Sequence, residues 1–294
     1  MTEPPTLPSM DDAPEAPQLI QRLRTGLAQL SPTERKVARA LLADYPSAGL
    51  DSVQSLAQQA QVSAPSVVRF ARRLGFRGFV ELQQALRAEL SWRSNGPLQL
   101  LDRRQTAGCH AELMETSLQA PCHAISQSLR HIPAFDMQQA IELLSQGGKR
   151  VTLGGGRFSQ SLALYLERHL RQLRPQVMLL PEVPHQRILP IVDAGRQDIF
   201  VLFDFRRYQR TMATLAQQVT ERGATLILVT DSHLSPLAAH AQVVLPVQVE
   251  SCWPFDTHAA AFVLTETLAA GVLARLGDQA LERMARWEQL DPQA

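Results

Sequence analysis

From residue 148 to residue 250, short apolar runs alternate with helical segments, and this alternation restricts the fold more than any other feature of the chain. Apolar runs at both odd and even positions are typical of strands covered on both faces, and βαβ repetition is typical of a parallel sheet. The sequence therefore predicts an α/β domain with a five-stranded parallel sheet. Its strands are expected in RVTLG (150–154), QVMLL (176–180), DIFVLFDF (198–205), TLILVTD (225–231) and AQVVLPVQV (241–249).

The chain before this region has a helical pattern, because apolar residues recur three and four positions apart from residue 18 to about residue 90. Five helices fit this stretch. Ser31 and Glu34 have the spacing of a capping box at the start of one helix. Asp51 and Ser63 are expected as N-caps of the next two helices, and Gly75 as a left-handed residue at a helix end.

A tight helix-turn-helix is expected where VQSLAQQA (53–60) is followed almost directly by a helix that begins at Ala64. On a helical wheel, residues 64–74 form a buried stripe of Val67, Phe70, Ala71 and Leu74. The opposite face carries Arg69, Arg72 and Arg73. No acidic residue occurs between positions 61 and 80, although the whole chain has a net charge of only +1.

This arginine face predicts binding to double-stranded DNA, because the guanidinium group pairs with guanine edges and with phosphate oxygens. The alternative is an ordinary solvated helix face, and Ser63 can be a plain N-cap rather than a DNA contact. The predicted DNA-binding residues are Ser63, Pro65, Ser66, Arg69, Arg72, Arg73 and Arg77.

A ligand site is expected at the carboxyl ends of the strands, where open α/β sheets bind small molecules. The glycine-rich loop after the first strand suits an anion, since it leads into a helix start. The alternative is a tight strand-to-helix turn that binds nothing. The predicted ligand-binding residues after the first, third and fourth strands are Gly155, Gly156, Arg157, Ser159, Asp204, Arg206, Arg207, Ser232 and His233.

Both halves of the chain resemble the RpiR/MurR family of transcriptional regulators, through LSPTERKVARALLADYP (30–46), SLAQQAQVSAPSVVRFARRLGFRGFVELQQAL (55–86) and the α/β region that follows. Members of that family join a helix-turn-helix domain to a sugar isomerase (SIS) domain. The resemblance implies a flavodoxin-like, three-layer SIS fold and operator binding by a homodimer or homotetramer. It also implies control by a phosphorylated sugar or a related acid.

The sequence departs from this family after the third strand. SIS domains usually have a segment of the kind Ser-x-Ser-Gly-x-Thr there, and this chain has FDFRRYQR (203–210). In one interpretation Arg206 or Arg207 clamps an acid together with Arg157. In the other, the arginines form salt bridges at a subunit interface, and Phe203 and Phe205 partly fill the pocket. Ligand binding is slightly favoured.

An enzymatic role is the main competing hypothesis. The resemblance adds Glu250 to the predicted ligand site, because SIS isomerases can keep a catalytic carboxylate after the fifth strand, and His258 is a possible partner. The missing sugar-phosphate segment and the attached DNA-binding unit argue against catalysis. We therefore expect a non-enzymatic regulator controlled by a small anionic metabolite. The remaining alternative is a DNA-binding protein whose SIS domain serves only oligomerisation.

Composition adds several expectations. The chain has 294 residues, which suits two domains, and its three cysteines form no Cys-x-x-Cys pair, so no metal, cofactor or disulfide is expected. Its acidic, proline-rich start does not resemble a signal peptide, and no membrane span is expected, so the cytoplasm is predicted. The apolar helix after Trp253 is expected to be exposed and to support oligomerisation.

The expected domain organisation has five parts. These are a disordered leader (1–17), a helix-turn-helix domain (18–92), a helical linker (93–147), an SIS domain (148–277) and a C-terminal tail or helix (278–294).

Overall fold

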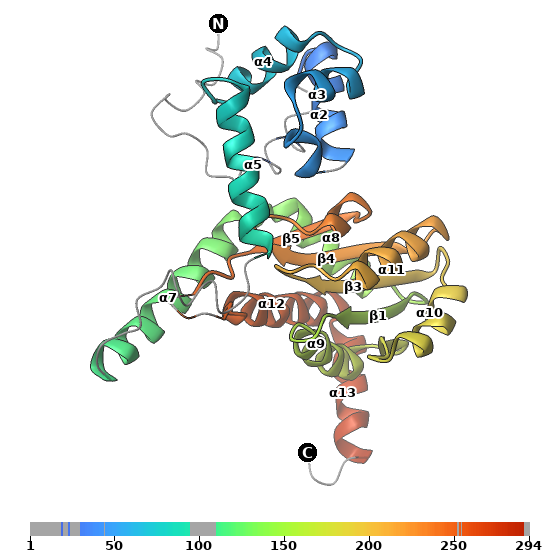
Figure 1. The fold of residues 1–294 in the computed structure, drawn as a ribbon. Coiled ribbons are helices and arrows are strands. Elements are labelled where there is room, and N and C mark those ends of the chain that lie inside the picture. Colours follow the sequence, from blue (N-terminus) through green and yellow to red (C-terminus); the bar gives the residue numbers. More distant parts are fainter. Residues whose placement is uncertain are drawn as a thin grey trace, which may run out of the picture. The chain divides into compact units, whose positions relative to one another are not determined.

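A computed structural model describes residues 19, 23, 30–43, 45–94, 110–251, 253 and 255–290 of the chain. It divides into two compact units, Met1–Ser94 and Asn95–Ala294, which we describe separately (Figure 1). The expected leader lies outside the described residues. The first expected helix does too, except for Leu19 and Leu23, which are buried.

The described part of the first unit consists of helices joined by short turns. Its apolar residues form one core, to which the buried stripe of α4 contributes Val67 and Phe70. The elements are α2 (Pro32–Ala43), the short 3₁₀ helix η2 (Ser47–Gly49), α3 (Val53–Gln59), α4 (Ala64–Arg73) and α5 (Phe79–Ser94). Helices α3 and α4 pack directly against each other. The predicted helix-turn-helix is therefore present.

Local signals at the helix ends explain most of these boundaries. The capping box before α2 is confirmed, because the Ser31 amide donates to Glu34 Oε2 at 2.9 Å and the Glu34 amide to Ser31 Oγ at 3.3 Å. Gly75 has a φ of +96°, as predicted. The prediction for Asp51 was wrong. Ser52 is the N-cap of α3, since its side chain accepts the Ser55 amide at 3.1 Å and leaves Asp51 one position too early.

The second unit is built on a five-stranded parallel sheet with strand order β2-β1-β3-β4-β5. All five expected strands are present. The central strands β1, β3 and β4 are almost wholly buried, which explains their continuous apolar sequence. The strands are β1 (Arg150–Gly155), β2 (Val177–Leu179), β3 (Asp198–Asp204), β4 (Thr225–Asp231) and β5 (Val243–Val247).

Helices cover both faces of this sheet (Figure 1). In the sheet, β2 lies on one side of β1, and β4 lies on the opposite side of β3. The connections β1–β2 and β3–β4 therefore run in opposite directions across the sheet. Because parallel crossovers are right-handed, α9 and α11 lie on opposite faces. The result is the expected three-layer arrangement. The elements are α9 (Gln160–Leu173), η3 (Pro184–Arg187), α10 (Ile188–Val192), α11 (Arg210–Glu221) and η4 (Pro236–Ala239).

Two helices correct the expected linker at 93–147. Helices α7 (His110–His131) and α8 (Ala134–Ser145) pack against β5 and against α12 (Ala259–Leu276), so they belong to the second unit. Ser128 Oγ of α7 accepts the amide of Gln248 at 2.8 Å. The weak amphipathic pattern was misleading because α7 is buried only from Ala124 onward in its described part.

Helix α12 was expected to be an exposed surface helix, and this holds only in part, because one face is buried while Glu266, Ala270 and Ala274 are exposed. It has the length and mean hydropathy of a membrane span, yet it packs against α7, α8 and α9 and buries Leu264, Leu268 and Val272. Its apolar composition is therefore explained in part by these contacts within the second unit. The final helix, α13 (Asp278–Leu290), packs against α9 and α12 and agrees with the expected C-terminal helix.

Candidate functional site

The exposed face of α4 carries the three predicted arginines. Arg69, Arg72 and Arg73 are all exposed, while Val67 and Phe70 on the opposite face are completely buried. The sequence-derived helical wheel is therefore confirmed. A cationic surface of this kind can contact phosphates and base edges together.

The serines at the start of α4 have different roles. Ser66 is only 7% exposed, and its Oγ lies 2.9 Å from Ser63 Oγ. Arg69 donates to the same Ser66 oxygen at 3.0 Å. Ser66 thus orients Arg69 from beneath, which differs from the predicted direct DNA contact, whereas Ser63 and Pro65 are exposed. Ser63 occupies the N-cap position without a side-chain cap bond.

Two acidic residues outside the segment 61–80, Glu34 and Glu81, lie beside this arginine face. Arg72 Nε donates to the Arg77 carbonyl at 3.3 Å, and the Arg77 amide donates to the carboxylate of Glu81. Hydrogen bonds from Ser31 lower the pKa of Glu34, and the charge of Arg73 lowers it further. These two carboxylates therefore offset part of the positive charge of the arginine face, although residues 61–80 contain no acidic residue.

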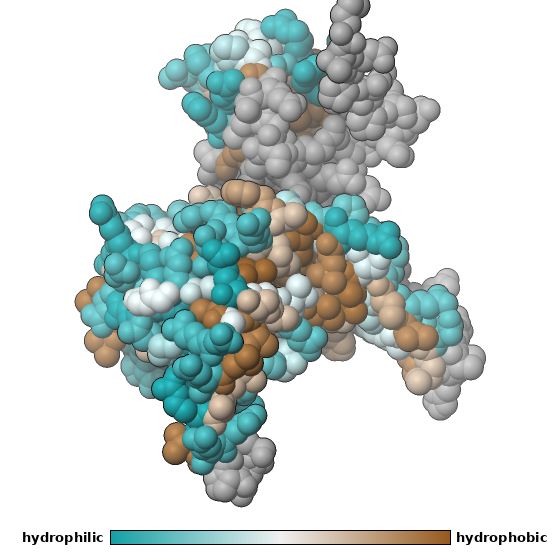
Figure 2. Space-filling model, turned by 180° about the vertical axis from the view of Figure 1, so that it is seen from behind, coloured by the Kyte–Doolittle hydropathy of each residue, from teal (hydrophilic) through white to brown (hydrophobic). Residues whose placement is uncertain are grey.

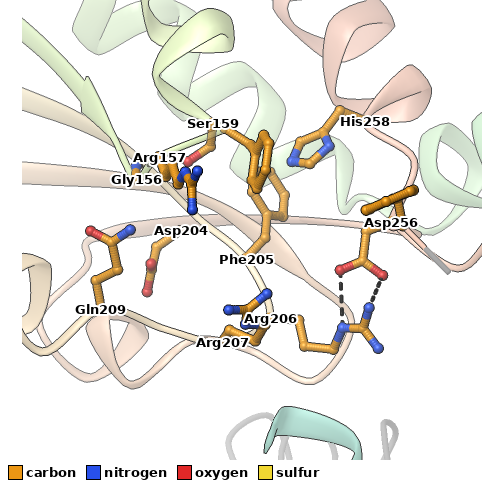
Figure 3. A pocket seen from close by; sticks show the side chains of 12 residues that line it. Gly156, Arg157, Ser159, Asp204, Phe205, Arg206, Arg207, Gln209, Asp256 and His258 are labelled. Carbon is orange, nitrogen blue, oxygen red and sulfur yellow. Dashed lines mark hydrogen bonds and ion pairs between the residues drawn. The ribbon is translucent and has the colours of Figure 1, made fainter. Parts of the chain in front are cut away.

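A second candidate site is a cavity of about 300 Å³ in the second unit (Figure 3). It lies beyond the carboxyl ends of β1 and β3, where the chain changes direction across the sheet. Ligands in open α/β folds bind at this position. The lining residues are Gly156, Arg157, Phe158, Ser159, Asp204, Phe205, Arg206, Arg207, Gln209, Phe255, Asp256 and His258.

Six of the ten predicted ligand residues line the cavity, and four do not. Gly155 lies beneath the loop, and Glu250 is exposed elsewhere. His233 is 3% exposed, because its amide donates to Asp231 Oδ1 at 2.9 Å and folds the turn after β4 inward. Ser232 is in the same turn. The predicted ligand contacts of these four residues therefore find no support in this cavity.

The glycine-rich loop is held by its own side chains. The Gly155 amide donates to Gln160 Oε1 and the Gly156 amide to Ser159 Oγ, both at 2.8 Å. A Cβ atom on Gly155 would lie 2.6 Å from the backbone of Ser159. Gly155 is therefore required by the tight turn itself, and the amides of both glycines are already hydrogen-bonded.

Asp204 closes the inner end of the cavity. It is 2% exposed and accepts hydrogen bonds from the Ser235 hydroxyl and from the Gln209 amide. Burial raises the pKa of this carboxyl to about 6, although both hydrogen bonds act in the opposite direction. Asp204 is therefore mostly ionised at neutral pH and titrates just below it.

Arg206 was expected either to bind a ligand or to form a salt bridge at a subunit interface. In the structure it forms a two-point ion pair with Asp256 of the same chain (Figure 3). Its Nε lies 2.9 Å from Asp256 Oδ2, and its Nη2 contacts Oδ1. The Arg206 side chain is 3% exposed. This pair joins the loop after β3 to the segment before α12.

Arg157 and Arg207 are exposed and enter the cavity from different loops. The guanidinium carbon of Arg157 lies 5.6 Å from the centre of the Phe158 ring. Arg207 has a φ of +69°, which is rare for a residue with a side chain. Among the described residues, neither arginine forms an ion pair with an acid within 4.0 Å.

His258 stands at the inner wall with an edge-to-face contact to Phe205, the ring centres being 5.0 Å apart. Burial lowers the pKa of His258, so the neutral imidazole is favoured near pH 7. Glu250, its suggested partner in isomerase chemistry, does not line this cavity. Within the described chain, no group of three or more His, Cys, Asp or Glu residues is arranged to hold a metal ion.

Sequence reasoning missed the contribution of the segment before α12. Phe255 and Asp256 are about 50 residues from their partners in the β3 loop, so no local pattern connects them. One available signal was the acid in WPFD (253–256), a possible partner for a pair of arginines in an otherwise apolar pocket.

Comparison with family models assigns both units. Residues 17–93 match the helix-turn-helix domain of the rpiR family, and residues 143–274 match the SIS domain. The HTH-type transcriptional regulator HexR of Pseudomonas aeruginosa is 26% identical over 263 residues, which cover 88% of this chain and 90% of HexR.

Solved structures agree with the fold. The sugar isomerase domain of an RpiR transcription factor from Sphaerobacter thermophilus has a TM-score of 0.56 at 20% identity, covering 60% of this chain and 98% of that one. Vibrio vulnificus NanR, solved in complex with ManNAc-6P, has a TM-score of 0.53 at 17% identity. Here 92% of this chain and 97% of NanR are covered.

Proposed function

The chain belongs to the RpiR family of transcriptional regulators, and on that basis we propose that it binds a double-stranded DNA operator through α4 under the control of a small anionic metabolite. The observation that carries the DNA-binding part is the exposed face of Arg69, Arg72 and Arg73 on the second helix of a helix-turn-helix. In this motif the second helix enters the major groove.

The roles of individual residues follow from their exposure and contacts. Arg69 is held by Ser66 and is positioned for a base edge, since an oriented guanidinium loses less side-chain entropy on binding. Arg72 and Arg73 are suited to phosphates. The exposed Ser63, Pro65 and Arg77 lie at the two ends of α4 and complete the proposed DNA-binding surface.

The proposed effector site is the cavity between the β1 and β3 loops. Arg157 and Arg207 supply positive charge at its mouth. Glu250 does not line this cavity, and of the two carboxylates that do, Asp256 is paired with Arg206 and Asp204 is buried. These observations support a sensor rather than an isomerase.

The segment before α12 offers a route from effector to DNA. Phe255, Asp256 and His258 line the effector cavity and also a second cavity against Ser117 and Pro121 of α7. A ligand that displaces this segment therefore changes the packing of α7. Helix α7 follows residues 95–109, which connect the two units in sequence, so the displacement can bias how the DNA-binding units are presented.

A cytoplasmic homo-oligomer is part of the proposal. The described residues of α7 before Ala124 include none that is buried, and Met114 and Leu118 are 71% and 62% exposed. Figure 2 shows apolar surface gathered between the arms formed by α7 and α13. Exposed apolar area of this kind is typical of protein interfaces.

The experiment replaces Arg69 and Arg73 with alanine and measures affinity for DNA fragments that the unaltered protein enriches from genomic DNA. We expect a large loss of affinity and a salt-dependence slope reduced by about one per lost phosphate contact. Arg87→Ala, at an exposed position on α5, is the matched control and should change neither quantity strongly. Unchanged affinity and slope in the double variant would refute DNA binding by α4.

A further inference from the structure

The glycine amides and the hydroxyl of the effector cavity, which could hold a phosphate, are already hydrogen-bonded within the protein. Both glycine amides of the β1 loop are hydrogen-bonded within the loop. Ser159 is the only hydroxyl side chain among the described lining residues. It accepts the Gly156 amide and donates to the Phe203 carbonyl at 2.8 Å, so its hydrogen-bonding capacity is largely used.

The turn before α11 already holds a carboxylate of the chain itself. Asp204 accepts the amide of Gln209, the residue that precedes the first turn of α11. A Cβ atom on Gly156 would lie 2.9 Å from Gln209 Nε2, which shows how closely the two loops meet. A phosphate dianion placed at this turn would face the Asp204 charge at short range, and like charges at such a distance strongly disfavour each other.

The groups that remain accessible are two arginines and several aromatic rings. Arg157 and Arg207 present planar guanidinium forks, which pair in two-point fashion with carboxylates and with phosphates, so the choice between these anions depends on the Asp204 charge. Phe158 and Phe255 line the cavity yet are 66% and 64% exposed, and Phe205 forms part of its inner wall. A volume of about 300 Å³ is at the small end of ligand pockets.

We propose that the ligand of this cavity is a small carboxylic acid with a planar, apolar body, and that phosphorylated sugars are excluded. The carboxylate pairs with Arg207 and Arg157 at the mouth, and the apolar body contacts the phenylalanine rings. Neutral His258 contributes a polar contact at the inner wall. This inference rests on the proposed effector function and specifies the ligand class.

The test measures binding of four probes to the full-length protein by calorimetry and thermal shift: benzoate, phenylacetate, inorganic phosphate and glucose 6-phosphate. We expect binding of an aromatic acid and none of the phosphates. Arg207→Gln should weaken acid binding about tenfold or more, as expected for the loss of charged hydrogen bonds. Arg168→Gln, an exposed arginine on α9 that does not line this cavity, should leave it unchanged.

A second variant tests the exclusion of phosphate directly. Asp204→Asn removes the buried charge with little change of shape, so glucose 6-phosphate should bind this variant more tightly than the unaltered protein. Arg207-dependent binding of phosphates but not of aromatic acids to the unaltered protein would overturn this inference and leave the effector function intact. Failure of both classes to bind would overturn the proposed effector site itself.

Discussion

At the scale of single residues, Asp204 carries an energetic cost that depends on pH. Its folded pKa of about 6 exceeds the ordinary value of 3.8, so between these values the native state keeps a proton that the unfolded chain has lost. The native state then binds more protons, and the free energy of unfolding falls as pH rises through this window. Ionisation of Asp204 therefore lowers the free energy of unfolding at neutral pH, compared with a side chain of ordinary pKa.

Replacing Asp204 with asparagine removes this titration. The stability of Asp204→Asn relative to the unaltered protein should rise by roughly 2 to 3 kcal/mol between pH 4 and pH 7, since two pKa units correspond to about 2.7 kcal/mol. Denaturant unfolding at both pH values measures the difference. His258 titrates in both proteins and cancels in the comparison. Parallel stability profiles would show that Asp204 keeps an ordinary pKa.

The role of a single residue could be predicted when it depends on near neighbours in the sequence, and could not when it depends on a distant partner. The arginine face of α4 depends on helical periodicity alone, and the structure exposes Arg69, Arg72 and Arg73 as expected. Arg206 was harder to interpret, because its partner Asp256 lies 50 positions away. The burial of Ser66 was missed for a related reason, since a serine near a helix start is equally compatible with a cap, a base contact or an internal bond.

At the scale of elements, Phe255, Asp256 and His258 before α12 line both cavities. The Arg206–Asp256 pair and the Phe205–His258 ring contact attach them to the β3 loop. Breaking a buried ion pair by removing one charge is strongly destabilising, because the other charge stays buried. The integrity of the proposed effector site should therefore depend on this pair.

Asp256→Asn tests that dependence. We expect it to destabilise the second unit by a few kcal/mol and to abolish the response of DNA binding to effector, while DNA affinity without effector persists. Glu142→Gln is the matched control, because Glu142 pairs with Arg275 at 3.1 Å with both side chains about half exposed. Such surface pairs contribute about 0 to 1 kcal/mol. An unaltered effector response in Asp256→Asn would contradict the proposed route.

Element predictions succeeded where burial is uniform and failed where it is not. Strands β1, β3 and β4 are buried on both faces, so their apolar runs are unambiguous. Helix α7 is buried along only part of its length, and its pattern resembles that of a linker. Helix α12 is apolar on nearly every side although only part of its surface is buried against three helices, and periodicity alone cannot tell its buried residues from its exposed ones.

At the scale of the whole molecule, two units with separate cores must communicate for an effector to regulate DNA binding. Thermodynamic linkage then imposes a symmetry. If the effector weakens operator binding by a given factor, operator DNA must weaken effector binding by the same factor, because both describe one cycle of states. Couplings of this kind are commonly about 5-fold to 150-fold.

This reciprocity can be measured on the protein with and without operator DNA. The dissociation constant of the best-binding aromatic acid should change between free protein and protein saturated with operator DNA, by the factor that the acid imposes on DNA binding. An SIS domain that serves only oligomerisation would give a factor of one in both measurements. Inserting a flexible Gly-Ser segment between residues 95 and 109 is the informative variant, because flexible linkers transmit little orientation. Both separate affinities should persist there while the coupling factor falls toward one, and an undiminished factor would exclude transmission through this connection.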